Sequence, residues 1–193
     1  MSKQYTQADI RKKLDKALTS KRYTHTLGVA GCAASLAMAH GADIEKANLA
    51  GMLHDCAKCI DIQKQFKLCK KYNIELSEAE KQSTALIHAK LGAYIAKNSY
   101  GVEDEEVLSA IRWHTTGKPE MTLLEKIVYI ADYIEPGRRD IPRLDEIRKM
   151  AFKDIDETMV IVLKSCLEYL ESKNAPIDPV TQETYDYYVK GNK

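Results

Sequence analysis

The sequence lacks the features that define several classes of protein. No apolar run approaches the roughly 20 residues of a membrane-spanning helix, and no apolar segment follows the lysine near Met1, so we expect neither a membrane span nor a signal peptide. Charge of one sign is not in excess, because 29 basic and 28 acidic residues give a formal net charge of +1. Neither nucleic acid nor a membrane surface is therefore an expected partner. These absences favour a cytoplasmic protein.

Further absences narrow the fold and the chemistry. No stretch alternates apolar and polar residues as a half-buried strand does, whereas apolar residues recur three and four positions apart almost throughout. A glycine-rich phosphate loop is missing, which argues against a kinase-like enzyme or a nucleotide switch. The five cysteines are an odd number, which suits reduced thiols better than a disulfide framework. With 45% apolar residues, the 193-residue chain can bury one core, so we predict an all-α, single-domain helical bundle over residues 1–193.

Capping residues and helix breakers suggest where the helices begin and end. Ser20 and Asp43 are expected to cap helices, and Gly41 and Gly101 to end the helices before them. The predicted helices cover residues 6–19, 20–40, 44–57, 61–72, 83–100, 103–115, 122–134, 142–150, 154–172 and 178–189, with a short helical turn at 77–80. A functional site would lie within residues 20–135, opening at the loops 73–83, 115–121 or 135–142, and the helices of residues 142–190 would pack on it.

Several ionisable side chains stand in apolar helical surroundings. His54 and Asp55 directly follow the apolar residues 49–53, and Asp132 lies inside the otherwise apolar stretch 127–134. Burying such a charge costs several kcal/mol unless a cation or a counter-charge neutralises it. Three more histidines lie beside apolar or small residues, whereas His40 sits at a helix end, where the dipole favours a cation. This leaves six candidate ligands on five predicted helices: His25, His54, Asp55, His88, His114 and Asp132.

Any one of these side chains could be an ordinary core or surface residue. All six together favour a metal site, because four imidazoles and two carboxylates can converge in the core of a helical bundle, where two-metal centres are usually built. Imidazole with carboxylate suits iron, manganese, zinc or nickel better than magnesium. Two such ions about 3.5–4 Å apart would turn a water between them into a nucleophile and neutralise phosphoryl oxygens. Hydrolysis at phosphorus is the expected chemistry.

The six candidate ligands resemble, in order and type, the pattern of the HD-domain metal-dependent phosphohydrolases, including the two extra histidines of their dinuclear branch. The segments 22–30, 54–58, 113–117 and 131–139 look closer still to one subfamily, the YqeK-type symmetrical bis(5'-nucleosyl)-tetraphosphatases, and the resemblance extends over residues 11–190. It implies an HD-type bundle with two divalent or mixed-valence metal ions, most often iron. Asp55 would bridge two ions, of which one is held also by His25, His54 and Asp132 and the other by His88 and His114.

The resemblance also implies a substrate. This is a dinucleoside tetraphosphate cut in the middle, so that diadenosine tetraphosphate gives two ADP. Three alternatives are hydrolysis of another nucleotide, such as a nucleoside di- or triphosphate or a signalling nucleotide, a nucleotide-binding sensor without turnover, and a helical interaction module without metal.

Asp55 and Lys58 are the predicted catalytic residues, and Lys58 and Arg22 are predicted to contact the substrate. Lys58 lies three residues after Asp55, and Arg22 lies three residues before His25, so both could reach a phosphate from a face that bears ligands. Each could instead be an exposed surface residue.

The loops suggest four further substrate contacts. Arg138 and Arg139 follow a helix break and suit bidentate phosphate binding, with Arg138 preferred, or they form a solvated turn paired with Asp140. Thr115 and Thr116 follow the last histidine and offer hydroxyls and backbone amides to a substrate, or they only end a helix.

Two other features are assigned structural roles. Cys56 and Cys59 have the spacing of a redox pair or of half a zinc site, but a strand-helix-strand setting and a second cysteine pair are lacking. Trp113 is expected in the core. A cluster of tyrosines is expected to pack on the body of the protein or on a partner chain in a homodimer: Tyr185, Tyr187 and Tyr188.

Overall fold

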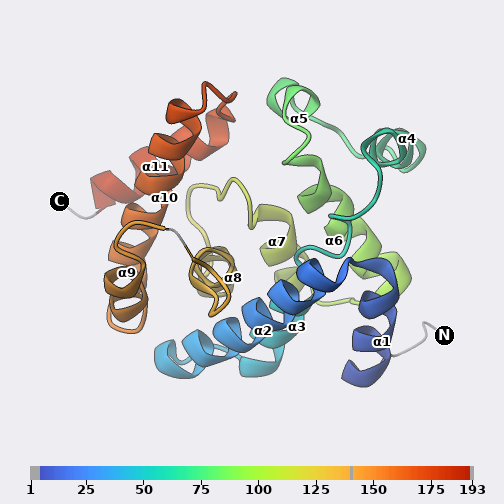
Figure 1. Cartoon of the computed structure of the whole chain (residues 1–193), viewed down its shortest axis with the longest axis horizontal. Helices are drawn as coiled ribbons and strands as arrows, with labels where there is room; N and C mark the ends of the chain where they lie inside the picture. The colour runs from blue at the N-terminus through green and yellow to red at the C-terminus, as the bar shows by residue number, and fades with distance from the viewer. Residues whose placement is uncertain (1–4, 140, 192–193) are drawn as a thin grey trace.

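The structure, a computed structural model, describes residues 5–139 and 141–191. Over these ranges it contains eleven α-helices and no β-strand, which confirms the all-α prediction (Figure 1). In chain order the helices are α1 (Gln7–Ala17), α2 (Ser20–His40), α3 (Ile44–Leu53), α4 (Ile62–Lys71), α5 (Glu78–Gln82), α6 (Ile87–Tyr100), α7 (Glu105–Trp113), α8 (Leu123–Ile134), α9 (Leu144–Ala151), α10 (Ile155–Ser172) and α11 (Pro179–Gly191). None of these helices is long and apolar enough to cross a membrane.

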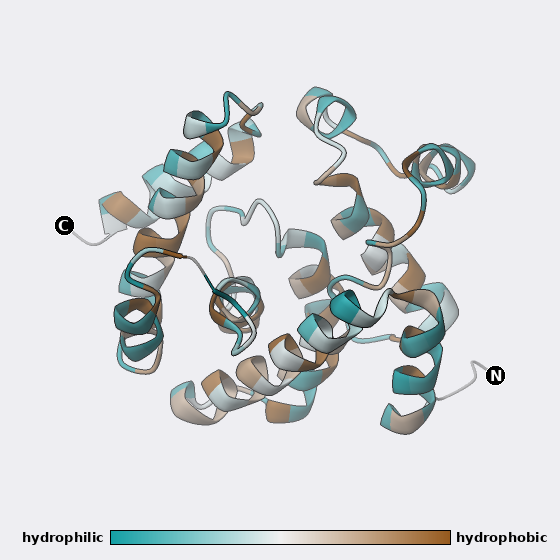
Figure 2. Cartoon of the chain, viewed as in Figure 1, coloured by the Kyte–Doolittle hydropathy of each residue, from teal (hydrophilic) through white to brown (hydrophobic). Residues whose placement is uncertain are grey.

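Helix α8 lies at the centre of the bundle, where it contacts α2, α3, α7, α9 and α10. It is apolar on nearly every side, and Ile127 and Ile130 are fully buried. Figure 1 views α8 almost end-on, with α2 and α3 below it, α7 and α6 to its right and α9, α10 and α11 to its left. Figure 2 shows teal, hydrophilic residues mainly on outer helices such as α1 and α9. The apolar residues therefore form a core around α8.

Helices α2 and α3 approach each other closely because Gly51 has no side chain. A Cβ atom at this position would lie only 2.9 Å from the Cα of Ala30 and 3.1 Å from the carbonyl oxygen of Val29. The close approach presses the end of α3 against α2. It thereby fixes the position of the residues that directly follow α3.

Most of the predicted helix ends agree with the structure. Asp43 caps α3, and Gly41 and Gly101 end α2 and α6 in the left-handed conformation, each at φ 71°. The prediction for the start of α2 is wrong by one residue, because the cap is Thr19 and Ser20 is already helical. Adjacent hydroxyl residues are equally good caps, so the sequence offered no basis for choosing between them.

Two helices differ from the prediction by four residues at one end. The helix predicted over 44–57 ends at Leu53, and the backbone continues in tighter turns such as the one closed by the bond from Cys56 N to the Leu53 carbonyl (3.1 Å). The helix predicted over 83–100 begins at Ile87, after a hydrogen-bonded turn. Both differences lie beside the candidate ligands, so the site is built at helix ends rather than within helices.

Candidate metal centre

Five helices bring the six candidate ligands to one place in the core. The side chains form three overlapping triplets, and within each triplet one ligand atom of each residue lies within 4.8 Å of the others. They come from α2, from the residues that directly follow α3 and α7, from the start of α6 and from the last turn of α8. The predicted convergence is therefore present in the structure.

Asp55 lies at the centre of this group, and its two oxygens face different histidines. Oδ1 lies 3.0 Å from His88 Nε2 and 3.8 Å from His114 Nε2. Oδ2 lies 3.3 Å from His54 Nε2 and 3.8 Å from His25 Nε2. One carboxylate thus joins two pairs of imidazoles, which is the arrangement that a bridging carboxylate requires.

His54 and His114 are oriented by the same local device. Each is the first residue after a helix, and its Nδ1 lies 2.7 Å from the carbonyl oxygen three residues earlier, that of Gly51 or of Ile111. A carbonyl oxygen only accepts hydrogen bonds, so Nδ1 carries the proton and Nε2 keeps a lone pair. Both rings therefore present Nε2 to the centre as a potential ligand.

Glu135 orients His25 in a similar way, and the sequence did not reveal this role. Its Oε1 lies 3.1 Å from His25 Nδ1, and its Oε2 accepts a hydrogen bond from the backbone amide of Gly137. The side chain is buried against α2, where a Cβ atom on Gly28 would lie 2.6 Å from Oε2. The available signal was the spacing, because Glu135 lies one turn after Asp132 on the same helical face.

The donor set fits a metal ion. The Nε2 atoms of His25 and His54 are buried and have no hydrogen-bond partner among the residues that the structure describes. His25 Nε2 nevertheless lies 3.0 Å from an oxygen of Asp132, and His88 Nε2 lies 3.1 Å from His114 Nε2. Lone pairs that face each other at this distance repel unless a proton or a metal cation lies between them.

Burial keeps two of the histidines neutral. It lowers the pKa of His114 to about 3, and the neighbouring His54 and His88 act in the same direction. Burial also lowers the pKa of His88. For Asp55, burial alone would raise the pKa, but the adjacent His54 and His88 hold it well below its usual value. At pH 7 His88 and His114 therefore offer neutral imidazole and Asp55 offers an ionised carboxylate, the forms that bind metals.

Three of the predicted substrate contacts lie beside the candidate ligands. Arg22 Nη1 lies 2.7 Å from Asp55 Oδ2, and Arg138 Nη2 lies 2.8 Å from Asp132 Oδ1. Lys58 Nζ lies 3.3 and 3.5 Å from the two ring nitrogens of His88, and burial lowers the pKa of this lysine. Three cationic groups therefore surround the centre.

Within the described residues, the other predicted contacts form no hydrogen bond with a candidate ligand. The Thr116 hydroxyl donates to the Gly117 carbonyl in its own loop, and Thr115 is half-buried next to it. The exposed Arg139 donates to the carbonyl oxygens of Pro136 and Arg138. The alternative partner, Asp140, lies outside the described residues. A role in substrate binding for these side chains stays a prediction.

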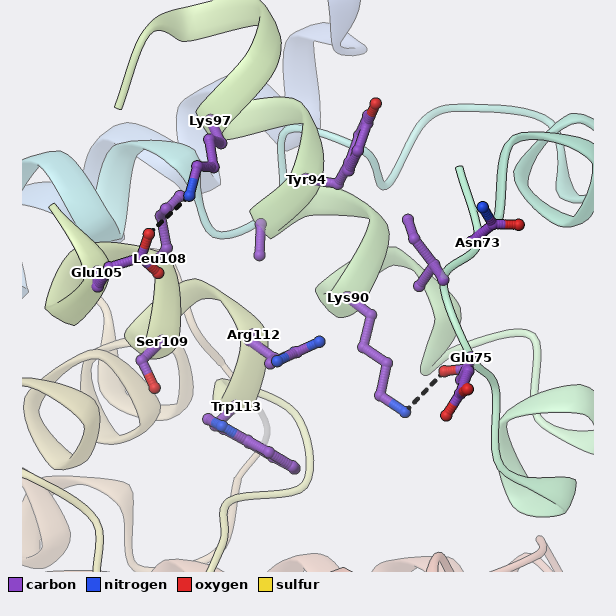
Figure 3. Close-up of a pocket in the computed structure, with 12 residues that line it drawn as sticks. Asn73, Glu75, Lys90, Tyr94, Lys97, Glu105, Leu108, Ser109, Arg112 and Trp113 are labelled. Carbon is purple, nitrogen blue, oxygen red and sulfur yellow. Dashed lines mark hydrogen bonds and ion pairs between the residues drawn. The ribbon is translucent and has the colours of Figure 1, made fainter. Parts of the chain in front are cut away.

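The remaining sequence features have structural explanations. Cys56 is buried, with its Sγ 3.4 Å from the Gly92 carbonyl oxygen, and burial raises the pKa of its thiol to about 12, while Cys59 is exposed. Trp113, expected in the core, is only half-buried and lines a surface cavity of about 780 Å³ between α6 and α7 (Figure 3). Tyr188 packs on the body of the protein, where its hydroxyl accepts the backbone amide of Met121 (3.1 Å).

The sequence and the site together identify a family. The HD-domain family model matches residues 22–137, a span that contains all six candidate ligands and Glu135. This chain belongs to the HD-domain family. The prediction of an HD-type helical fold is thereby confirmed, and residues 138–191 of the structure add the C-terminal helices to the matched span.

Known proteins resemble the chain over nearly its whole length. It is 42% identical to the symmetrical bis(5'-nucleosyl)-tetraphosphatase of Bacillus subtilis (strain 168), over 91% of this chain and 93% of that protein. It is 39% identical to the protein of the same name from Staphylococcus aureus (strain NCTC 8325 / PS 47), over 89% and 88% of the two chains. A crystal structure of a predicted HD superfamily hydrolase involved in NAD metabolism, from Clostridium acetobutylicum, has 38% sequence identity and superposes with a TM-score of 0.94, over 98% of this chain and 100% of that one.

Proposed function

We propose that this protein hydrolyses dinucleoside tetraphosphates symmetrically, so that diadenosine tetraphosphate gives two ADP. The observation that carries the proposal is the 42% identity, over 91% of the chain, to a relative named as a symmetrical bis(5'-nucleosyl)-tetraphosphatase. The site agrees with this chemistry, because cationic side chains surround a cluster of imidazoles and carboxylates that can hold metal. The protein would be a metal-dependent phosphoric anhydride hydrolase.

The proposed cofactor is a pair of transition-metal ions, divalent or mixed-valence, with iron expected and manganese, zinc or nickel as alternatives. One ion would be held by His25, His54, Asp132 and Asp55 Oδ2, and the other by His88, His114 and Asp55 Oδ1. When bound, two such ions supply an activated water and neutralise charge on the phosphoryl group. The Nδ1 hydrogen bonds of His25, His54 and His114 keep these rings aimed at the centre.

The substrate phosphates are proposed to bind to the cations around the centre. Arg22 and Arg138 lie beside the ligand carboxylates and can each donate two parallel hydrogen bonds to a phosphate. Lys58 Nζ lies 3.3 Å from His88 Nδ1 and would place a single positive charge beside the phosphate that is attacked. Arg139, Thr115 and Thr116 are proposed as outer contacts.

Product identity tests this proposal. The purified protein is reconstituted anaerobically with iron, incubated with diadenosine tetraphosphate, and the products are separated by chromatography. We expect ADP alone, and no product after treatment with a chelator. Formation of AMP with ATP would overturn symmetrical cleavage. Full metal content and tight ADP binding without hydrolysis of any nucleotide would indicate a sensor instead, and absence of bound metal would indicate an interaction module.

Two proposals concern the location and the oligomeric state of the enzyme. One is a cytoplasmic location, with which the balance of 29 basic and 28 acidic residues agrees. A homodimer would use the tyrosines of α11 that stay accessible, since Tyr187 is exposed while Tyr188 packs inward. Light scattering on the purified chain tests the dimer, and a monomer mass would remove this part of the proposal.

A further inference from the structure

Among the described residues, the candidate metal centre is accessible to solvent mainly at Asp132 and His25, and this side of the centre is its opening. The side chain of Asp132 is 24% exposed and that of His25 is 10% exposed, whereas those of the other four candidate ligands are at most 3% exposed. Arg22 and Arg138 stand beside this opening, with side chains that are 31% and 37% exposed. A substrate that reaches the centre from this side therefore meets these two guanidinium groups.

A second cavity has Arg138 in its wall and is lined otherwise by residues between Arg139 and Arg148. It has a volume of about 500 Å³, and its wall includes four arginines and only two carboxylates. Arg138 belongs both to this wall and to the centre, because its guanidinium also donates to Asp132. Ile141 and Leu144 add apolar surface to the wall. The cavity thus combines positive charge with apolar area, as a site for a nucleoside phosphate requires.

The four arginines have different tasks. Arg148 donates to the backbone carbonyls of Ile134 (3.0 Å) and Glu135 (2.8 Å), so it mainly holds the end of α8. Arg143 pairs with Glu146 at 2.7 Å, but both side chains are largely exposed, and such a pair is weak. Arg139 bonds only to carbonyl oxygens among the described residues. Arg139 and Arg143 can therefore turn to an anion at low cost.

We propose that this arginine-lined cavity binds one nucleoside diphosphate half of the substrate, while the bond to be cut lies at the metal centre. This inference rests on the proposed function, because a tetraphosphate with a nucleoside at each end leaves one half outside the centre on the open side. Arg139 and Arg143 then bind the phosphates of that half, and Ile141 and Leu144 contact its nucleoside. The cavity makes the enzyme selective for substrates with two nucleoside ends.

The cavity of Figure 3 is a less suitable place for that half. One of its cations is already neutralised, since Lys90 pairs at 2.7 Å with Glu80, whose side chain is only 7% exposed. Figure 3 shows Lys90 turned to the Glu75 carbonyl and Lys97 turned to Glu105. In the described part of the chain, no side chain that lines this cavity bonds to a candidate ligand. Its exposed Arg112 serves as a matched control.

The test compares a double variant, Arg139→Gln with Arg143→Gln, with the wild type and with Arg112→Gln. Calorimetric titration of the metal-loaded proteins with ADP is expected to find two ADP per chain in the wild type and in Arg112→Gln, and one in the double variant. The KM for diadenosine tetraphosphate should rise about tenfold or more in the double variant, because the loss of charge-assisted hydrogen bonds to the phosphates weakens substrate binding by about this factor. The kcat should change little. Both arginines are exposed, so the thermal unfolding temperature should not move.

Two outcomes would overturn the inference. In the first, the double variant keeps the second ADP site and an unchanged KM. In the second, Arg112→Gln loses the second ADP site instead. Failure of the proposed function is distinct, because the wild type would then leave diadenosine tetraphosphate intact whatever its ADP stoichiometry. A wild type that binds two ADP without hydrolysis would keep the arginine-lined site and remove the activity.

Discussion

Replacement of Glu135 by alanine is expected to weaken metal binding while leaving the fold in place. Glu135 is 4% exposed and accepts two N–H groups, the Nδ1–H of His25 and the backbone amide of Gly137. Without the carboxylate, the His25 ring can change its tautomer or rotate, so its Nε2 is no longer held towards the centre. Partners of this kind change metal affinity by about 10- to 100-fold, or about 1.4–2.8 kcal/mol.

Two further variants distinguish the negative charge of Glu135 from the space that its side chain occupies. In Glu135→Gln only one oxygen can accept a hydrogen bond, and the new amide N–H group faces His25 or Gly137, so the loss of metal affinity should lie between those of wild type and alanine. In Gly28→Ala the carboxylate is kept, but the new Cβ atom would lie 2.6 Å from its Oε2 and must displace it. This variant should therefore also lose metal affinity, although it removes no charge.

The assay is competition for metal between the protein and a chelator of known affinity, followed by turnover of diadenosine tetraphosphate under saturating metal. Glu168→Gln is a suitable control, because Glu168 is exposed on α10 and its carboxylate lies 3.9 Å from Lys164. Unchanged metal affinity in Glu135→Ala, measured beside this control, would refute the argument that the carboxylate orients His25.

Three other substitutions test the site and the core. Asp55→Ala should abolish both metal retention after desalting and ADP release, since it removes both facing oxygens at once; normal activity would contradict the site. Arg138→Ala should raise the KM more than it lowers kcat, with unchanged metal content, as steady-state kinetics and elemental analysis would reveal. Gly51→Ala should lower the free energy of unfolding by about 1–3 kcal/mol, because the added Cβ atom would meet the Ala30 Cα at 2.9 Å. Each kcal/mol lowers the unfolding temperature by about 2–4 °C. Gly31→Ala, with nothing within 4 Å of the new atom, is the control in thermal unfolding.

The convergence of the candidate ligands could be predicted because their local sequences are apolar. Asp132 lies in a helix that is buried along almost its whole length, and Asp55 follows residues that are themselves buried. A buried carboxylate needs a cationic or hydrogen-bonding partner. The available candidates were the histidines that also lie in apolar surroundings. The free-energy cost of burying these carboxylates could thus be inferred from their neighbours in the sequence.

The helix ends at the site were harder to predict. The segment after Leu53 has no proline or glycine to stop the helix, and its composition suits further helical turns. The helix stops there because the His54 ring bonds back to the Gly51 carbonyl and the backbone continues through short turns. The ring is held by its position in the assembled core, so propensity along the chain did not determine the boundary.

Glu135 could not be predicted in the same way, because its neighbours in the sequence do not indicate that it is buried. It stands before Pro136 and Gly137 at a helix end, where a carboxylate usually faces solvent, so its local sequence gave no sign of burial. Its role depends on His25, 110 residues away, and on the space that Gly28 leaves on α2. Arg148, beyond the matched HD span, then holds the backbone of Glu135 in place. Candidate metal ligands can therefore be found from the cost of burying them, whereas the spacing of Glu135 from Asp132 becomes informative only when the crossing of the helices is known.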